Sequence, residues 1–154
     1  MLRLSICLIV FLFLSSTNGS PCQDGYTQLN GGDCFKTIIS HVNTFSFDEA
    51  ERQCNSDGGM LASIHNAEED RLASQMSCED PAGIVNFAST SIGLKCAGLD
   101  CKWTDGTAMD YTHFEEGREP TNDNRAKCYF VDIFEGPFFG LWDTWGCGPR
   151  SGCY

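Results

Sequence analysis

Residues 46–64, "SFDEAERQCNSDGGMLASI", decide the fold of this chain. Ser46 followed by Glu49 forms a capping box, which is typical of a helix N-terminus. Three residues recur at helical spacing and share one apolar face: Phe47, Ala50 and Cys54. A Gly-Gly pair then favours the end of the helix, and "MLASI" predicts a short buried strand.

A second helix is predicted directly afterwards, over "NAEEDRLASQM" at residues 66–76. Asn66 is its N-cap, and Glu69 follows three residues later. Its apolar face is expected to hold Leu72, Ala73 and Met76. The helical period then disappears, and residues 77–127 read as irregular chain with short apolar fragments such as "SIGL" and "CKWT". So long an irregular region is usually functional or held by disulfides.

The last part of the chain predicts strands. "CYFVDIF" and "FFGLW" read as two strands joined by a Glu-Gly-Pro turn, and a final short strand ends in "SGCY". The order is two helices, a long irregular region and an antiparallel meander. This order predicts an α+β domain.

The N-terminus "MLRLSICLIVFLFLSSTNG" resembles a cleaved secretory signal. Arg3 is a short basic region, and the apolar run over residues 6–14 is too short to span a bilayer. We place cleavage after Gly19, which leaves residues 20–154 as a single secreted, extracellular domain. The alternative is an N-terminal membrane anchor.

The net charge of the chain limits the classes of binding partner that we expect. The formal net charge is −11, and loss of residues 1–19 removes Arg3 and no acid, which gives −11 − 1 = −12. Such acidity argues against nucleic acid or an anionic membrane as partner. It also supplies oxygens for a cation site, although solubility alone would explain it.

Cysteine usage points to disulfides. Cys7 leaves with the signal, and nine cysteines stay in an exported domain, where disulfides are expected rather than zinc. The three histidines carry no metal-ligand spacing: His41, His65 and His113. Because nine is odd, one thiol is free or pairs with another chain.

Several motifs, in order, resemble the C-type lectin-like domain family. The stretch "FDEAERQCNSDGGMLASIHNAEE" is similar to its first-helix motif, and "SIGL" to Trp-Ile-Gly-Leu with Ser91 in place of Trp. "WTDGT", "EPT" and "LWDTWGC" resemble its later motifs, and "CQDGYTQLNGGDCFK" resembles the N-terminal hairpin of its long form. The added Cys96 and Cys101 look like secreted single-domain members from nematodes.

The resemblance implies three disulfides: Cys22–Cys34, Cys54–Cys153 and Cys128–Cys147. The second would close about 100 residues, worth roughly 4.7 kcal/mol in the chain-entropy model. Cys96 and Cys101 are close enough to bridge one loop, which leaves Cys78 as the unpaired candidate. Alternatively, Cys78 pairs with one of those two. A free Cys78 predicts a disulfide-linked homodimer, with a monomer as the alternative.

The resemblance also implies a site shared by calcium and sugar, built from five side chains and a cis peptide before a proline. This sequence retains Glu119 and Pro120, but the other four positions are substituted. Thr121 replaces Asn, Ala126 replaces Glu, Asp143 replaces Asn and Thr144 replaces Asp. Asn122 and Lys127 stand where an auxiliary calcium site would need carboxylates.

The site is therefore expected to be degenerate, with no required cofactor. Its candidate metal ligands are Glu119 and Asp143, and its candidate ligand-binding residues are Glu119, Thr121, Asn122, Asp143 and Thr144. Calcium prefers about 6–8 hard oxygen ligands, more than these residues supply.

We expect a secreted binding protein that recognises carbohydrate or glycoconjugate surfaces, with a role in innate defence by analogy with the family. The alternative is a calcium-independent, protein-binding module without sugar activity. Sugar-stacking candidates are Trp103, Tyr111, Phe114 and Trp145, whereas Trp142 is assigned to the core. No paired acids or partnered nucleophile predict catalysis, so an enzyme is not expected.

Overall fold

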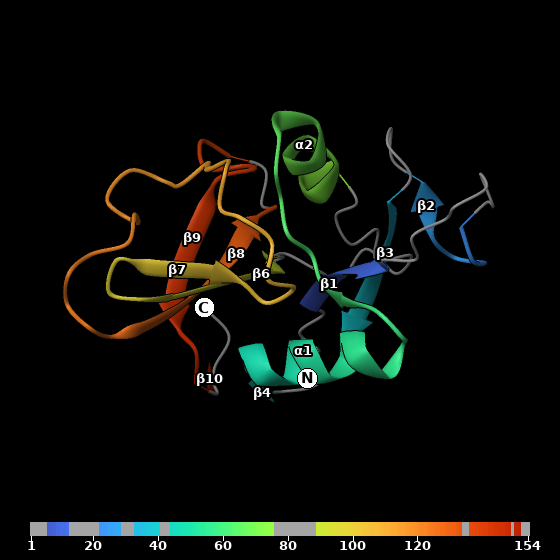
Figure 1. The fold of residues 1–154 in the computed structure, drawn as a ribbon, viewed down its shortest axis with the longest axis horizontal. Helices are drawn as coiled ribbons and strands as arrows, with labels where there is room; N and C mark the ends of the chain where they lie inside the picture. Colours follow the sequence, from blue (N-terminus) through green and yellow to red (C-terminus); the bar gives the residue numbers. More distant parts are fainter. Residues whose placement is uncertain are drawn as a thin grey trace.

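The computed structural model describes residues 6–12, 22–28, 33–40, 44–75, 89–133, 136–148 and 150–151. Its main sheet has the strand order β2-β3-β1-β6-β8-β9, with β5 added to β1 and β7 added to β6. The two helices lie on opposite sides of the strands (Figure 1). Both helices and this largely antiparallel sheet form the α+β fold that the sequence predicts.

Helix α1, Phe47–Ser56, forms as predicted. The Ser46 hydroxyl accepts a hydrogen bond from the Glu49 amide at 3.2 Å, which satisfies one of the unpaired amides of the first turn. The three residues of the expected apolar face are the ones it buries: Phe47, Ala50 and Cys54. Beyond its C-cap, Gly58 takes a φ of +85°, a conformation that favours glycine.

Helix α2, Ala67–Gln75, also begins as predicted. The Asn66 side-chain oxygen accepts from the amides of Glu68 and Glu69 at 3.0 Å each. The expected apolar face is wrong in part, because the buried residues are Asp70, Ala73 and Ser74. Leu72 is half-buried, and Met76 lies outside the described residues. A buried carboxylate cannot be read from hydrophobic period, because its burial depends on partners elsewhere in the fold.

The N-terminal half of the sheet contains β1, Ile6–Leu12, and β3, Cys34–Ser40, which pair antiparallel along their whole length. Strand β2, Thr27–Gln28, extends β3, and β5, Met60–Leu61, pairs with β1. Strand β1 also meets β6 in parallel. The residues expected to form the core of a cleaved signal thus lie inside the sheet of the full chain, while the cleavage itself stays a prediction.

The expectation of irregular chain over residues 77–127 is wrong in part. Strand β6, Ser89–Ala97, and β7, Asp100–Trp103, form a hairpin. Residues 90–94 of β6 are all buried, so the strand lacks the alternation by which a half-buried strand is recognised. Of the described residues between 89 and 127, those outside the named strands are the hairpin turn at 98–99 and residues 104–125. We call residues 104–125 the long loop.

The C-terminal meander is shifted from its predicted bounds. Strand β8, Ala126–Asp132, pairs with β6 and with β9, Trp142–Gly146. "FFGLW" is therefore not a strand throughout, because Phe138 and Phe139 lie exposed in the preceding turn. Strand β10, Arg150–Ser151, pairs with β4, Thr44–Phe45, and residues 152–154 lie outside the described part.

Among the described residues, three disulfides are formed: Cys22–Cys34, Cys96–Cys101 and Cys128–Cys147. Cys54 is instead a free thiol, fully buried in a cluster with Phe47, Leu61 and Cys128. The expected pairing of Cys54 with Cys153 is therefore not formed here, and the Cys54 thiol lies on the buried face of α1. Cys153 and Cys78 lie outside the described residues.

The larger core cluster lies between α2 and strands β6, β8 and β9. Trp142 is fully buried in it, as predicted. Among the described residues, no helix combines the length and apolarity needed to cross a membrane.

Candidate functional site

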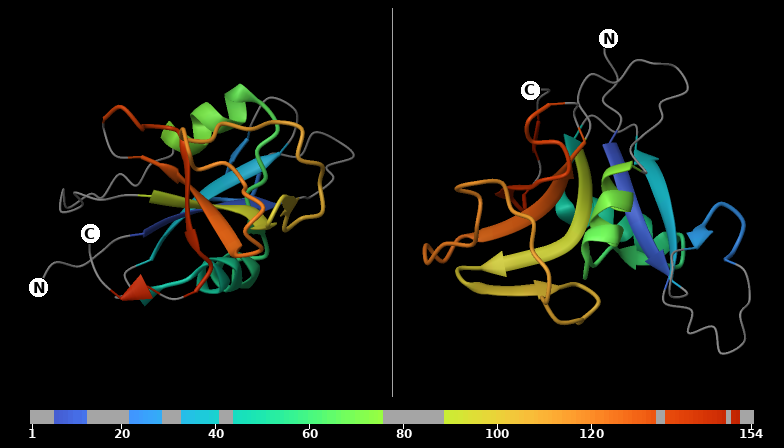
Figure 2. Two further views of the ribbon diagram at one scale, coloured as in Figure 1. Left: turned by 90° about the vertical axis from the view of Figure 1, so that its left-hand side faces the viewer. Right: turned by 90° about the horizontal axis from the view of Figure 1, so that it is seen from above.

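The long loop lies at the end of the molecule formed by β6–β9, away from the β2–β3 hairpin (Figures 1 and 2). Its start is ordered locally, because the Asp105 carboxylate accepts from both the amide and the hydroxyl of Thr107, at 2.8 and 2.6 Å. Its middle joins β9 through a parallel bridge between Phe114 and Trp142. Its end carries the Glu-Pro-Thr motif and passes into β8.

Lys127, the second residue of β8, reaches back into this motif. Its ammonium group lies 2.8 Å from the Thr121 hydroxyl and 3.4 Å from the Glu119 carbonyl oxygen. Strand pairing fixes its position, since Lys127 lies opposite Cys96 of β6 and Gly146 of β9. A protein cation therefore contacts two oxygens of the motif that the resemblance assigns to calcium.

A second cation holds the other half of the site. The Arg118 guanidinium lies 3.0 Å from the Asp143 carboxylate and 3.8 Å from that of Glu115. Asp143 also accepts from the Thr144 amide at 2.6 Å, and the Thr144 hydroxyl donates to the Cys128 carbonyl oxygen at 3.0 Å. The hydrogen-bonding groups of both β9 residues are thus directed to the protein itself.

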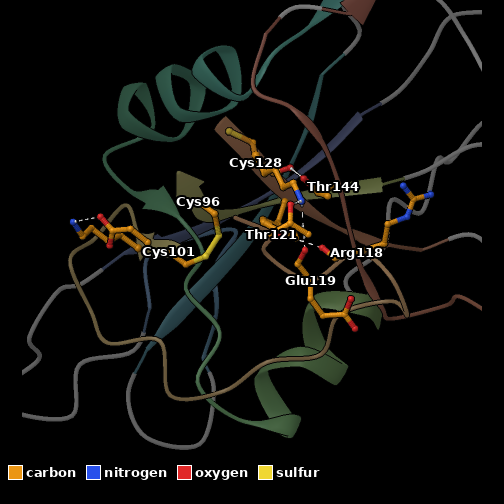
Figure 3. The surroundings of a disulfide bond; sticks show 11 residues. Cys96, Cys101, Arg118, Glu119, Thr121, Cys128 and Thr144 are labelled. Atoms are coloured by element: carbon orange, nitrogen blue, oxygen red, sulfur yellow. Dashed lines mark hydrogen bonds and ion pairs between the residues drawn. A yellow bond between two sulfur atoms is a disulfide. The ribbon is translucent and has the colours of Figure 1, made fainter. Parts of the chain in front are cut away.

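Tyr129 of β8 also contacts the long loop, and its hydroxyl donates to the Arg118 carbonyl oxygen at 3.0 Å. Burial, followed by the negative charges of Glu119, Asp143 and Asp123, raises the pKa of Tyr129 to about 12. The three acids therefore share one region. The Glu119 side chain is exposed, however, and points away from Thr121 and Thr144 (Figure 3).

Asp123 and Arg125 form a closed pair inside the loop. The guanidinium of Arg125 donates to Asp123 at 3.0 and 2.8 Å, and its amide donates at 3.2 Å. The hydrogen bonds from the Arg125 amide and guanidinium hold the pKa of Asp123 below its usual range. Asn122 is exposed beside them.

The tip of the β6–β7 hairpin supports this loop. Gly98 has a φ of +63°, and a Cβ added there would lie 3.4 Å from the Asn124 side-chain oxygen. Asn124 itself has a φ of 55°, a left-handed conformation that asparagine tolerates better than most residues. The Cys96–Cys101 disulfide closes the same hairpin (Figure 3), which presents the 66% exposed Leu99 at its turn.

These contacts do not fit a calcium ion. Of the five carried-over positions, Ala126 supplies no oxygen ligand, and Thr121 and Asp143 contact protein cations. No group of three or more His, Cys, Asp or Glu in the described ranges could hold a metal ion. The described chain has no cis peptide bond, so the peptide before Pro120 is trans and the cis peptide implied by the resemblance does not form.

The candidate sugar-stacking aromatics belong mostly to the core. Trp103 is only 2% exposed, and Tyr111 and Phe114 are partly buried against the main cluster. All three lie near Trp142, with ring centroids at 5.4 to 5.9 Å. The Trp145 side chain lies outside the described part.

Sequence reasoning noted Lys127 but missed the roles of Arg118, Arg125 and Tyr129. One signal was present: the segment "REPTNDNRAK" places three basic residues around its acids, in a chain with only 10 Lys and Arg against 21 Asp and Glu. Such spacing permits internal neutralisation. Which acid each base meets depends on the pairing of β8 with β6 and β9.

The profile of the family described as "Lectin C-type domain" matches residues 43–151. The chain therefore belongs to the C-type lectin domain family.

Among its relatives is snaclec EMS16 subunit beta of Echis multisquamatus, 34% identical over 145 residues, covering 91% of this chain and 82% of the relative. Snaclec clone 2100755 of Deinagkistrodon acutus is 32% identical over 108 residues, and the match spans 68% of this chain and 64% of that protein. A calcium-independent type II antifreeze protein of known structure is 26% identical, with a TM-score of 0.61 over 85% of this chain and 95% of that one.

Proposed function

We propose that this domain is a secreted recognition module that binds a protein ligand without calcium. The observation that carries the proposal is the position of Lys127, whose ammonium group contacts Thr121 and the Glu119 carbonyl oxygen. Arg118 contacts Asp143 in the same way. The domain thus supplies its own cations at Thr121 and Asp143, two of the side chains that the family resemblance assigns to the metal.

Electrostatics supports this reading. Two unit charges 4 Å apart near a protein surface interact by about 4 kcal/mol, and a divalent ion doubles that value. Calcium bound beside the Lys127 ammonium would meet repulsion of this order unless the lysine moved. It would also have to displace Arg118 from Asp143. The remaining Glu119 carboxylate is a weak basis for a site that needs about 6–8 oxygens.

A protein ligand is favoured over a sugar for two reasons. Sugar binding in this family, as the resemblance implies it, uses the bound calcium. The aromatic alternative also loses support, because Trp103 is buried and Tyr111 and Phe114 pack against the core. The exposed surface instead combines Leu99 with the charged loop over residues 115–127. We propose no catalytic role for any of these residues.

Secretion is part of the proposal and has two supports. Three disulfides form between described cysteines, and such bridges persist in oxidising compartments. The N-terminal apolar run is the second. N-terminal sequencing of the exported protein checks the processing: a start at Ser20 agrees with cleavage, whereas a start upstream of Ile6 would mean that β1 is retained.

A glycan array probed with calcium and again with chelator tests the proposed function. We expect no glycan signal that chelator abolishes. A chelator-sensitive signal that is also lost in Glu119→Gln would overturn the proposal and restore the calcium-dependent lectin reading. A signal that is indifferent to chelator would keep the calcium-independent part and replace protein by glycan as the ligand class.

A further inference from the structure

The two histidines in the described part of the chain both pair with aspartates across one seam. His65 follows β5, and its Nδ1 lies 2.7 Å from the carboxylate of Asp110 in the long loop. His113 belongs to the long loop, and its Nδ1 lies 2.5 Å from the carboxylate of Asp70 in α2. In the first pair the long loop supplies the aspartate, and in the second pair it supplies the histidine. Both pairs therefore join the long loop to residues 62–75.

Asp70 makes the second pair the stronger constraint. It is only 4% exposed, and a buried carboxylate needs compensating donors. The Trp142 indole donates to it at 2.6 Å, His113 contacts its other oxygen, and the Tyr111 hydroxyl lies 3.4 Å away. Of these groups only His113 can gain a positive charge. A protonated His113 would form an ion pair with the buried Asp70 carboxylate in place of a neutral hydrogen bond.

The other groups that face each histidine are known. Tyr111 lies 6.4 Å from His113 between ring centroids, and the Trp142 amide donates to the His113 carbonyl oxygen at 2.8 Å. Glu69 accepts from the His65 amide at 2.6 Å, and Trp103 lies 6.1 Å from His65 between centroids. The ionisable neighbours of the two histidines are thus carboxylates and one phenol.

Backbone hydrogen bonds connect the two histidine–aspartate pairs to the part of the long loop proposed to bind the ligand. Next to His113, the Glu115 amide donates to the Trp142 carbonyl oxygen at 3.0 Å, and the Arg118 amide donates to that of Glu115 at 2.9 Å. The Arg118 side chain then contacts Asp143. Backbone hydrogen bonds through Trp142 thus connect residues 113–115 with the segment that carries the Glu-Pro-Thr motif.

We propose that the two histidine–aspartate pairs form a pH-sensitive fastening of the long loop, which is held more firmly at mildly acidic pH than at neutral pH. The imidazole is the side chain whose charge changes between about pH 5 and 8, and each of these two imidazoles lies against a carboxylate. The hydrogen bond from His65 holds the pKa of Asp110 below its usual range, which keeps that carboxylate ionised as the histidine gains its proton. The inference concerns the loop itself and does not depend on the ligand class.

Amide hydrogen exchange of the secreted protein at pH 5.5 and 7.5, corrected for intrinsic rates, tests the fastening. The measured quantity is protection of residues 104–118 relative to α1. Two pairs of this kind predict a rise of roughly fivefold in the wild type at pH 5.5. The double variant His65→Gln/His113→Gln keeps a side-chain donor but cannot gain charge, so its ratio is expected to stay within about twofold. His41→Gln is the matched control and should behave as the wild type.

A wild-type ratio that does not change with pH would overturn the proposal, as would an equal rise in the double variant. If the double variant does not fold, Asp110→Asn decides instead, since the Asp110 side chain is 59% exposed and its replacement is tolerable for the fold. A smaller rise than in the wild type is expected there. An unchanged rise in Asp110→Asn would then refute the His65 half of the fastening and the paired mechanism with it.

Discussion

Lys127 shows how one side chain changes the chemistry of a site. It follows Ala126, which offers no ligand, and its ammonium group contacts Thr121 and Glu119. A lysine side chain is long and flexible enough to adopt this position from β8, whereas a shorter residue is not. The loop therefore still contacts a cation, the Lys127 ammonium group, although it has fewer carboxylates than the family motif.

Asp57 is a second single residue with a predictable effect, because it makes the stability of the domain depend on acidic pH. It caps α1, accepts from the Tyr26 hydroxyl at 2.6 Å and pairs with Lys36 at 2.9 Å. The hydrogen bonds from Tyr26 and then Lys36 lower its pKa. Since the unfolded value is about 3.9, the stabilisation is present above about pH 4 and is lost as pH falls through the folded value.

We expect Asp57→Asn to lower the free energy of unfolding by about 1 kcal/mol at pH 7, because the contacts are partly exposed. The variant should also lose less stability than the wild type between pH 5 and pH 2.5. Urea unfolding at both values measures this, with the exposed Asp100→Asn as control. Equal acid losses in wild type and Asp57→Asn would refute the role of Asp57.

The buried thiol of Cys54 predicts how the stability of the domain changes at alkaline pH. Burial, the first cause, and the nearby charge of Asp57 raise the pKa of its thiol to about 12. The unfolded thiol ionises near 8.5, so the unfolded state loses the proton first. Stability should hold below about pH 8.5 and then fall by about 1.4 kcal/mol per pH unit.

In Cys54→Ala this slope should shrink, while the contributions of the tyrosines remain in both proteins. Unfolding at pH 8, 9 and 10 provides the comparison. Iodoacetamide should modify Cys54 only in denaturant. Labelling of the native protein at this residue would contradict the buried, unpaired thiol.

At the scale of elements, the disulfides rank by the chain they close. Cys96–Cys101 spans 5 residues within one hairpin, whereas Cys128–Cys147 spans 19 and joins β8 to the end of β9. The chain-entropy model assigns about 2 kcal/mol to the first and about 3 kcal/mol to the second. Double serine variants of each pair, compared by urea midpoint, should follow that order. The reverse order would show that the β6–β7 hairpin matters more than loop length indicates.

The elements also show what the sequence could predict. Both helices were predictable because their capping chemistry is local, as in the bond from the Glu49 amide to Ser46. Strand β6 was missed because burial on both faces removes the alternating pattern. "FFGLW" was misread because Phe138 and Phe139 are apolar yet exposed in a turn. The substitutions in the candidate site were visible, but the contacts of Arg118 and Lys127 depend on strand pairing.

At the scale of the whole molecule, oligomeric state depends on Cys78, which lies outside the described residues. Because Cys54 is itself a free thiol, the odd cysteine count no longer singles out Cys78. We retain the disulfide-linked homodimer through Cys78 as a prediction from its polar sequence context, "QMSCEDPAG". Two linked domains would bind a surface more tightly than one where geometry allows both to engage. A non-reducing gel should show a dimer in the wild type and a monomer in Cys78→Ser. A wild-type monomer with one free or capped thiol would disprove it.

The central claim is that the domain does not bind calcium, and it concerns the stability of the whole domain. A ligand that binds only the folded state raises stability by RT ln(1 + [L]/Kd), so millimolar calcium at a micromolar site would add about 4 kcal/mol. In a domain of this size that corresponds to a Tm rise of many degrees. The structure instead places Lys127 and Arg118 against the oxygens such a site would use.

The most direct measurement is the Tm of the secreted protein with millimolar calcium and with chelator, alongside Glu119→Gln. We predict a difference below about one degree in both proteins, because a site without appreciable affinity adds no stability. A calcium-dependent rise above about five degrees in the wild type that is lost in Glu119→Gln would contradict the account.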